Sequence, residues 1–433
     1  MRECEAMTIS SAEQRRRLES LPRAALAEHQ LARLNELLAV ILPANKFYAE
    51  KLAHCPQHLE SLEQLAVLPL TTKNELIAFG GPMSLPKNLT WPLDRYVHYH
   101  QTSGTRGRPL SVLDTAEDWQ WWIDDWQFVL DAAEISAADR VLMAFSFGPF
   151  IGFWSAHDAV IARGGLAIPS GGMNTLARLD LLGRTAATAL FSTPNYALHM
   201  AEVAREHKIN LAQFEVRKIV VAGEPGGSVP STRQRIELAW NARVTDHSGA
   251  SEVGPWGYAD SQQRGLHVLE SEFIAEFLHV ETGDPAEEGD LAQLVLTSLG
   301  RRGMPVLRYR TGDLVRPSWP TSGPNRFVLL EGGVLGRADD MMVVRGVNIF
   351  PSSVEQIMHS FPEVVEYRLT ARKKGELDEL VIEVEDHLQE PQRIAEELVL
   401  RLGLKVEVRL APVMSLPRFE GKGQRFVDLR RPT

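Results

Sequence analysis

One short loop concentrates residues that could bind an anion: positions 100–109 read HQTSGTRGRP, directly after a β-prone run at 96–100. Gly104 and Gly107 let the backbone turn sharply and present N–H groups to a ligand. Arg106 and Arg108 add fixed positive charge with several donors each. The same composition is typical of an ordinary polar hairpin turn, and no Gly-Lys-Ser/Thr closes the loop as in a Walker motif. The loop therefore predicts either a phosphate cradle or a plain turn.

Later stretches combine charged residues with glycine in ways that core packing does not require. In 248–254, Glu252 stands beside a glycine turn and could hold Mg²⁺ against phosphates, as carboxylates commonly do. In 309–314, Asp313 is expected in a tight turn after a strand, where it could accept ribose hydroxyls. Asp339 and Lys422 lie in two further glycine-containing runs, 336–351 and 420–425.

Each of these side chains also has a plain interpretation. Glu252 could simply be exposed, Asp313 could be an ordinary turn residue, and Asp339 could be a helix cap. Lys422 alone is more typical of a solvated surface. The motifs have to be judged together.

The elements that would position these residues follow from apolar spacing, which alternates between strand and helix periods through the middle of the chain. The expected strands are 141–145, 165–169, 189–191, 218–222 and 242–245, and the expected helices are 116–133, 153–163, 176–187, 194–207 and 229–240. This alternation predicts a doubly wound parallel sheet. Ligands bind such sheets at the carboxyl ends of the strands, where 223–226 and 246–249 fall. Before this region, 11–53 is expected to be helical, and Thr72 with Glu75 predicts a capping box.

The remaining third of the chain predicts two further parts. Strands expected at 273–276, 291–297 and 306–309 indicate a small barrel or sheet, and the glycine-containing segment 331–340 reads as a linker. Beyond it, a helix that starts through a capping box at 352–355, strands at 364–370, 379–384 and 405–410, and a helix at 392–402 indicate a compact α+β module. The fold class expected is therefore α/β: a large N-terminal domain, 1–336, with doubly wound mixed or parallel sheets and a small β-barrel-like part, then a small α+β domain, 337–433.

Composition excludes several functions. The 433 residues carry a formal net charge of −10, which argues against general nucleic-acid binding and against an anionic membrane surface as partner. Two cysteines suggest no disulfide framework and cannot form a structural zinc site alone. The N-terminal residues lack a secretory pattern, and no apolar run reaches membrane-spanning length. A cytoplasmic enzyme is expected.

In their order and spacing, the motifs resemble those of the acyl-adenylate-forming superfamily, and within it the phenylacetate–CoA ligase-like branch. Residues 102–109 resemble its serine/threonine/glycine phosphate loop, and 417–425, PRFEGKGQR, are similar to the branch's catalytic-lysine segment. The most specific signatures are the runs 309–313, 336–340 and 345–351. The resemblance extends from about residue 47 to residue 430, and five ordered motifs are far more specific than any one of them.

The resemblance implies an ATP-dependent reaction in two steps. A carboxylate attacks the α-phosphate of Mg·ATP and releases pyrophosphate, and a thiol, most often that of coenzyme A, then displaces AMP from the acyl-adenylate. Lys422 would bridge the acyl carboxylate and the nucleotide in the first step. Asp339 would be the hinge of the C-terminal domain, which would act as a mobile lid.

The other implied roles fall on residues that match the motifs. Glu252 would bind Mg²⁺, and Asp313 would bind the ribose hydroxyls with Arg337 nearby. The implied ATP-binding residues are Thr102, Ser103, Gly104, Thr105, Gly107, Arg108, Gly223, Glu224, Pro225, Asp246, His247 and Ser248. The implied acyl-pocket residues are Phe147, Gly148, Phe150, Ile151, Ala222, Gly249 and Ala250.

Some positions depart from the superfamily pattern. Arg108 replaces a loop lysine and keeps the positive charge. Ser248 stands where an aromatic residue usually stacks on adenine, so the stacking falls to His247 or is lost. His267 stands without the cysteines that form a zinc site in some relatives, so no zinc is expected.

An aromatic carboxylic acid is the expected substrate. The run FSFGPFIGFW at 145–154 holds five aromatic residues that would stack on a planar ring, although core packing would also explain them. A benzoate, a hydroxylated aryl acid, a naphthoate and a phenylacetate all stay open. So do a carrier-protein phosphopantetheine or another acceptor in place of coenzyme A, a non-catalytic nucleotide-binding role, and a homodimer.

Overall fold

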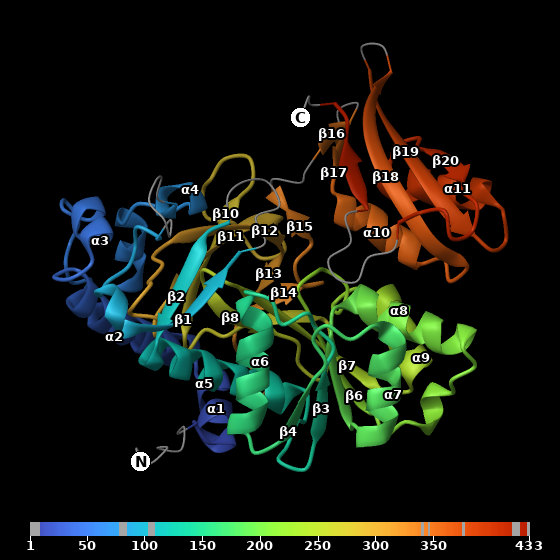
Figure 1. Ribbon diagram of the computed structural model, residues 1–433. Coiled ribbons are helices and arrows are strands. Elements are labelled where there is room, and N and C mark those ends of the chain that lie inside the picture. Colours follow the sequence, from blue (N-terminus) through green and yellow to red (C-terminus); the bar gives the residue numbers. More distant parts are fainter. Residues whose placement is uncertain are drawn as a thin grey trace.

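The computed structural model describes residues 9–77, 85–102, 109–338, 342–344, 347–374, 377–417 and 425–430. Its centre is a sheet of nine strands (Figure 1). The parallel strands are β3 (Arg140–Met143), β4 (Leu166–Pro169), β5 (Ala189–Ser192), β6 (Lys218–Ala222) and β7 (Arg243–Ala250). The antiparallel strands are β8 (Gly254–Tyr258), β9 (Gly265–Val268), β13 (Pro317–Ser318) and β14 (Leu329–Glu331). The order β13-β14-β9-β8-β7-β6-β5-β3-β4 makes the sheet mixed, as expected.

Helices cover both faces of the parallel half, which confirms the doubly wound arrangement. Successive strand residues point to opposite faces, so each strand feeds two cores. Met143, Phe191 and Val220 join one core with α5 (Ala116–Ala132) and α6 (Ile151–Ala162). Leu190, Val221 and Val244 join a second core. The helices of that second core are α7 (Thr175–Thr185), α8 (Pro194–Glu206) and α9 (Pro230–Trp240).

The predicted small β part is a four-stranded antiparallel sheet in the order β10-β11-β12-β15. Its strands are β10 (Phe273–His279), β11 (Ala292–Ser298), β12 (Tyr309–Val315) and β15 (Gly336–Arg337). The strand expected at 306–309 is misplaced, because Arg308 has a positive φ of 47° and the extended chain begins only at Tyr309. Asp313 therefore lies within β12 and not in a turn after a strand. A hairpin of β1 (Tyr96–Gln101) and β2 (Ser111–Thr115) precedes α5 and flanks the glycine loop.

The C-terminal part has a hydrophobic core of its own. Its elements are β16 (Met342–Val344), β17 (Val347–Ile349), α10 (Pro351–His359), β18 (Val364–Lys374), β19 (Leu377–Asp386), α11 (Pro391–Leu402), β20 (Glu407–Leu410) and β21 (Phe426–Asp428). The capping box expected at 352–355 is wrong: Phe350 is the N-cap without a side-chain hydrogen bond, and Pro351 occupies the first turn. The predicted domain boundary at 336/337 falls inside β15, and the division into domains stays a prediction.

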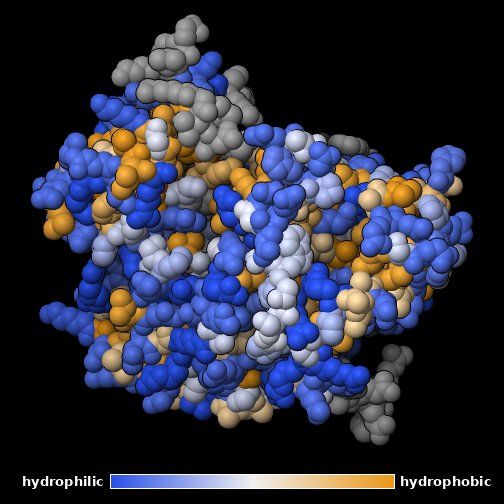
Figure 2. All heavy atoms as spheres, turned by 180° about the vertical axis from the view of Figure 1, so that it is seen from behind, coloured by the Kyte–Doolittle hydropathy of each residue, from blue (hydrophilic) through white to orange (hydrophobic). Residues whose placement is uncertain are grey.

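The N-terminal part is helical, as predicted. Its helices are α1 (Ala12–Glu19), α2 (Arg23–Ile41), α3 (Lys46–Lys51) and α4 (Lys73–Leu76), with short 3₁₀ turns at η1 (Leu62–Val67) and η2 (Leu93–Arg95). A further 3₁₀ turn, η3 (Leu211–Gln213), lies between α8 and β6. The capping box of Thr72 and Glu75 is present. None of the helices in the described ranges is long and apolar enough to cross a membrane. Figure 2 shows a face on which hydrophilic residues predominate and hydrophobic ones are scattered among them.

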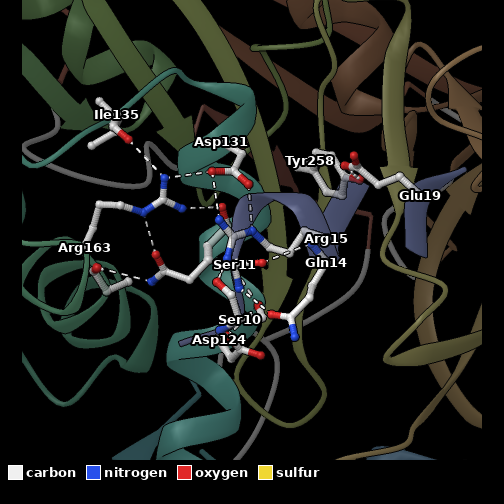
Figure 3. A network of polar contacts seen from close by, with 12 residues as sticks. Ser10, Ser11, Gln14, Arg15, Glu19, Asp124, Asp131, Ile135, Arg163 and Tyr258 are labelled. Atoms are coloured by element: carbon white, nitrogen blue, oxygen red, sulfur yellow. Dashed lines mark hydrogen bonds and ion pairs between the residues drawn. The ribbon is translucent and has the colours of Figure 1, made fainter. Parts of the chain in front are cut away.

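A buried arginine ties α1 to the core (Figure 3). The Arg15 guanidinium donates from Nε to Asp131 Oδ2 at 2.6 Å and from a second nitrogen to Asp131 Oδ1 at 3.0 Å. Arg163 of the α6 C-terminus donates to the same carboxylate at 2.7 Å. One aspartate therefore holds two guanidinium groups from different helices.

Because Asp131→Asn would strip the charge from this junction, it is expected to lower the free energy of unfolding by about 2–3 kcal/mol. Asp180→Asn is the matched control, since the Asp180–Arg184 pair is more than 60% exposed on both sides and is expected to contribute less than about 0.5 kcal/mol. Urea denaturation followed by circular dichroism measures both. Equal, small effects would show that the junction is not stabilising.

Candidate active site

The carboxyl ends of β5, β6 and β7 bring the central sequence motifs together. In parallel strands these ends meet at one edge of the sheet. The segments that follow β6 and β7 are 223–228 and 251–253, and Thr193 caps α8 directly after β5. The predicted residues Gly223, Glu224, Pro225 and Glu252 therefore lie at one edge, whereas the run 246–249, expected after its strand, lies within β7.

Asp246 holds one of these segments in place. Its carboxylate is buried and accepts a hydrogen bond from Ser228 Oγ at 2.6 Å. Burial raises the pKa of Asp246 to about 6, and the Ser228 hydrogen bond opposes the shift. A side chain on Gly227 would place its Cβ 2.4 Å from Asp246 Oδ1, so glycine is required there. Asp246 thus fixes the turn that carries Gly223, an exposed glycine with a φ of +92°.

His247 points to the opposite face from Asp246. Its ring lies 4.2 Å from the Trp126 ring of α5, and its Nδ1 lies 2.8 Å from the carbonyl oxygen of Gly257. Ala222 pairs with His247 in register and so faces the same side. Because side chains alternate along the strand, the half-buried Ser248 lies on the same side of the sheet as Asp246. His247 lies on the other side, where the acyl group is predicted to bind. The stacking of His247 on adenine stays a prediction.

A cluster of polar side chains connects three separate sequence motifs. Tyr309 Oη donates to Glu252 Oε1 at 2.7 Å, and an Arg337 nitrogen donates to Asp313 Oδ1 at 3.0 Å. Burial raises the pKa of Asp313, and Arg337 opposes that shift. Tyr309 and Asp313 belong to β12, and Arg337 lies opposite Asp313 on β15. The structure therefore brings Glu252, Asp313 and Arg337 into one site, although the hydroxyl of Tyr309 was not singled out from the sequence.

A buried ion pair stabilises the turn that carries Glu252. Arg301 and Asp114 are fully buried, and the guanidinium lies 2.7 Å from Asp114 Oδ1. Arg301 also donates to the carbonyl oxygen of Ser251 at 2.9 Å. Arg301 thereby fixes the carbonyl group next to Glu252. This contact could not be predicted from the sequence, because Asp114, Ser251 and Arg301 are far apart in the chain.

The arrangement fits a magnesium ion that arrives with the nucleotide. Glu252 is half-buried, and Tyr309 occupies only one of its carboxylate oxygens. Magnesium usually takes one or two protein carboxylates and completes its shell with phosphates and water. Within the described ranges there is no group of three or more His, Cys, Asp or Glu side chains that could hold a metal ion. His267 contacts Asp260 and the Phe327 carbonyl oxygen through its two ring nitrogens.

The aromatic run lies on the same side of the sheet as His247. Phe145 stacks on Phe153 with ring centroids 3.9 Å apart, and the Phe147 ring meets Trp154 edge-on at 5.0 Å. Phe147 has a φ of +49°, a strained conformation for an aromatic residue. Of the remaining predicted pocket residues, Ile151 lies in the core, Gly249 is exposed, and Gly148, Phe150, Ala222 and Ala250 are half-buried.

A polar seam joins the C-terminal part to this edge of the sheet. Glu224 accepts a hydrogen bond from the backbone N–H of Asn195 at 3.0 Å, and the Asn195 side-chain amide donates to Glu355 of α10 at 3.1 Å. Arg425 donates to Glu366 at 3.0 Å and lies 3.5 Å from Glu355. Two carboxylates thus contact one arginine, and the Glu224 carboxylate also interacts with it electrostatically. Asn195 was not singled out from the sequence, and Glu355 was predicted only as part of a capping box.

Several predicted site residues lie outside the described residues. They are Ser103, Gly104, Thr105, Gly107, Arg108, Asp339 and Lys422. Thr102 is described: its buried Oγ1 accepts from the N–H of Leu110 at 2.9 Å, and its own N–H donates to the Leu110 carbonyl oxygen. Thr102 therefore closes the base of the glycine loop.

The Tyr309–Glu252 hydrogen bond can be tested directly. Tyr309→Phe is expected to lower adenylation about tenfold at limiting Mg²⁺ and less at saturating Mg²⁺, because the carboxylate loses the donor that orients it. Tyr258→Phe is the matched control, since Tyr258 Oη also donates to a carboxylate, that of Glu19 at 2.5 Å, within the N-terminal network of Figure 3. Steady-state rates over a Mg²⁺ titration give the result. The same loss in both variants would contradict the assignment.

Comparison with known proteins agrees with this geometry. Residues 346–430 match the family described as AMP-binding enzyme C-terminal domain. The chain is 30% identical to phenylacetate-coenzyme A ligase of Thermus thermophilus, over 96% of this chain and 99% of that protein.

Two crystal structures of one ligase are also similar. The structure of 2-hydroxyisobutyryl-CoA ligase in the postadenylation state superposes with a TM-score of 0.90 at 25% identity, covering 97% of this chain and 94% of that chain. The same ligase with 2-HIB-AMP and CoA in the thioesterification state gives a TM-score of 0.73 at 27% identity, covering 98% and 94%. With full-length similarity at this level, and with Glu252, Asp313 and Arg337 of the described motifs in one site, the chain belongs to the phenylacetate–CoA ligase family of the acyl-adenylate-forming superfamily.

Proposed function

We propose that this protein is an AMP-forming ligase that joins an aromatic carboxylic acid to coenzyme A. In the first half-reaction, a carboxylate oxygen attacks the α-phosphorus of ATP, the bond to the β-phosphate breaks, and pyrophosphate leaves. In the second, the thiol sulfur attacks the acyl carbonyl carbon, the thiol loses its proton, and AMP leaves. We assign the reaction to the cytoplasm.

The observation that carries this proposal is the group formed by Glu252, Tyr309, Asp313 and Arg337. Motifs that lie far apart in sequence converge here, at the end of the sheet where nucleotides bind in open α/β folds. Asp313 offers a carboxylate to the ribose hydroxyls and Arg337 holds its orientation. A bound Mg²⁺ would neutralise phosphate charge, and Glu252, oriented by Tyr309, would be the residue that holds it.

Positioning and electrostatics account for the rest of the first step. Both reactants are anions, so a cation between them stabilises the transition state, and Lys422 is assigned this role. The residues of the loop at 102–108 would bind the phosphates of the departing pyrophosphate through N–H and hydroxyl donors. Asp246 contributes indirectly, because it fixes the 223–228 turn beside the nucleotide.

The position of the C-terminal part against the main sheet fits the first half-reaction better than the second. This chain superposes better on the postadenylation structure of 2-hydroxyisobutyryl-CoA ligase than on its thioesterification structure. In the arrangement described here, the seam of Glu224, Asn195, Glu355 and Arg425 holds the C-terminal part against the sheet. We assign this seam to adenylation, and we assign thiolation to a rotated arrangement about Asp339 in which the seam is open.

Glu355 makes the proposed equilibrium sensitive to pH. Burial, and then the nearby Glu224 carboxylate, raise the pKa of Glu355 to about 7, while Arg425 opposes the shift and Asn195 donates a hydrogen bond. Glu366 also raises the pKa, and His359 Nε2 lies 4.0 Å from Glu355. The neutral acid therefore stabilises the seam. The stabilisation of the seam by the neutral acid is complete below pH 4.5, the ordinary pKa of a glutamate, and is lost as the pH rises to about 7.

The ratio of adenylation to thiolation is accordingly expected to fall between about pH 5 and pH 7, by at most about tenfold per pH unit. Glu355→Gln is expected to flatten this dependence, because the amide is neutral throughout. Glu383→Gln is the control, since the Glu383–Arg368 pair is partly exposed on β19 and β18. Both half-reactions are measured over the pH range. An unchanged slope in Glu355→Gln would exclude this role.

Product analysis with a panel of acids tests the function as a whole. The panel holds benzoates, phenylacetates, naphthoates and aliphatic acids, including 2-hydroxyisobutyrate, each with ATP, Mg²⁺ and coenzyme A. Acyl-CoA and AMP are expected in equal amounts with at least one aromatic acid. Turnover of aliphatic acids alone would overturn the aromatic assignment, and AMP release without acyl-CoA would favour another acceptor, such as a carrier-protein phosphopantetheine.

A further inference from the structure

We propose that His247 selects acids that carry a hydrogen-bond donor on the acyl group, such as a phenolic hydroxyl, by accepting that hydrogen bond at its Nε2. This inference rests on the proposed function, and it concerns the substrate class of the same site. The relevant features are the ring's tautomer, its unpartnered nitrogen and its surroundings.

The tautomer follows from the partner of Nδ1. A carbonyl oxygen can only accept, so the 2.8 Å contact with Gly257 requires a hydrogen on Nδ1. Burial lowers the pKa of His247 to about 4, and the Gly257 contact opposes the shift. At neutral pH the ring is therefore uncharged, and Nε2 presents a lone pair. A neutral acceptor prefers a hydroxyl or amino donor and gives no advantage to a second carboxylate.

Nε2 lacks a hydrogen-bond partner among the residues that the structure describes. A Cβ added to Gly249 would lie 3.5 Å from this nitrogen, so Nε2 faces the space above Gly249. Gly249 is exposed, whereas His247 is only 6% exposed. Nε2 is not among the fully buried polar atoms of the described residues, so this acceptor is accessible from the exposed side of Gly249, where a ligand donor would bind it. The absence of a side chain on Gly249 keeps the approach to Nε2 open.

Neighbouring groups fix the ring without competing for Nε2. Trp126 lies against it, and the indole Nε1–H donates to Ser155 Oγ at 2.9 Å. Ser155 in turn donates to the carbonyl oxygen of Gly152 at 3.2 Å. The Trp126 and Ser155 donors are thus already engaged. Phe191, with its ring 6.3 Å from Trp126, extends the aromatic surface.

His247 lies on the side of the sheet where the acyl group is predicted to bind. Ala222, in register with His247, and the aromatic run that begins at Phe145 lie on this side, whereas Asp246 faces the other. An aryl ring bound between these aromatic side chains would direct a ring substituent toward Nε2. The hydroxyl would then distinguish substrates of otherwise equal size and shape.

The test compares three acids at each ring position: the unsubstituted benzoate or phenylacetate, its hydroxyl derivative and its methyl ether. Acid-dependent ATP–pyrophosphate exchange gives kcat/KM. For the wild-type enzyme, a hydroxyl at one ring position is expected to raise kcat/KM about tenfold or more over the unsubstituted acid, and the methyl ether, which cannot donate, is expected to show no gain.

His247→Phe keeps a ring of similar shape but removes the acceptor, so it is expected to abolish the hydroxyl preference. His247→Gln restores an acceptor and is expected to recover part of it. Thermal melting of each variant separates misfolding from lost discrimination. Equal kcat/KM for hydroxylated and unsubstituted acids in the wild type would overturn the inference, as would a preference that survives in His247→Phe. Exchange with none of the acids would instead reject the proposed function.

Discussion

Replacing Lys422 by alanine is expected to slow adenylate formation by about 100-fold or more, while thiolation of a supplied acyl-adenylate continues near the wild-type rate. The attacking carboxylate and the triphosphate are both anionic, and the lysine is assigned the position between them. The second half-reaction starts from a neutral acyl carbonyl group and does not need that cation.

Lys405→Ala is the control for this comparison, because Lys405 is an exposed lysine of the same C-terminal part. ATP–pyrophosphate exchange measures the first step, and acyl-CoA formed from supplied adenylate measures the second. Adenylation that survives the Lys422 change would show that the role is misassigned. A proportional loss in both steps would indicate a structural defect.

Arg425→Met is expected to produce the second largest effect, a loss of about 100-fold in adenylation with a smaller loss in thiolation. Arg425 stands three positions after Lys422 and is anchored by Glu366 and Glu355. Without the guanidinium, these two carboxylates and Glu224 would face one another with no cation among them. Removing one partner of a buried ion pair costs about 3–5 kcal/mol, because the remaining charge is left uncompensated.

Arg425→Lys keeps the charge but loses the planar fork, so partial activity is expected. Arg368→Met is the matched control, since its ion pair with Glu383 is 41% and 33% exposed. Melting temperatures identify variants that lose the fold of the C-terminal part. Adenylation within about twofold of wild type in Arg425→Met, at an unchanged melting temperature, would contradict the role of the seam.

Local patterns were sufficient to predict the parallel half of the main sheet, but not its antiparallel strands β8, β9, β13 and β14. The strands at 189–191 and 218–222 were predicted from short apolar runs, and the helix between them from Thr193 and Pro194, because caps and periodicity are properties of neighbouring residues. The same reasoning failed at 306–309 and 352–355. A positive φ at Arg308 delays the strand there, and proline starts the helix without a capping box.

The polar groups of the site depend on contacts between distant residues and could not be predicted in this way. Arg301 reaches Asp114 and the Ser251 carbonyl oxygen only after three elements pack together. Asn195 and Glu355 meet only when the C-terminal part docks. If the strand predicted at 242–245 had been extended to residue 250, the alternation of side chains along it would have shown that His247 and Asp246 point to opposite faces. The partners of His247 still required the fold.

Acid-dependent exchange of labelled pyrophosphate into ATP, measured without coenzyme A, tests the central claim most directly. The account predicts exchange with at least one aromatic acid, a requirement for Mg²⁺, and no exchange when the acid is omitted. No exchange with any acid in the panel, from an enzyme that melts cooperatively, would contradict the assignment of adenylate-forming activity to this protein.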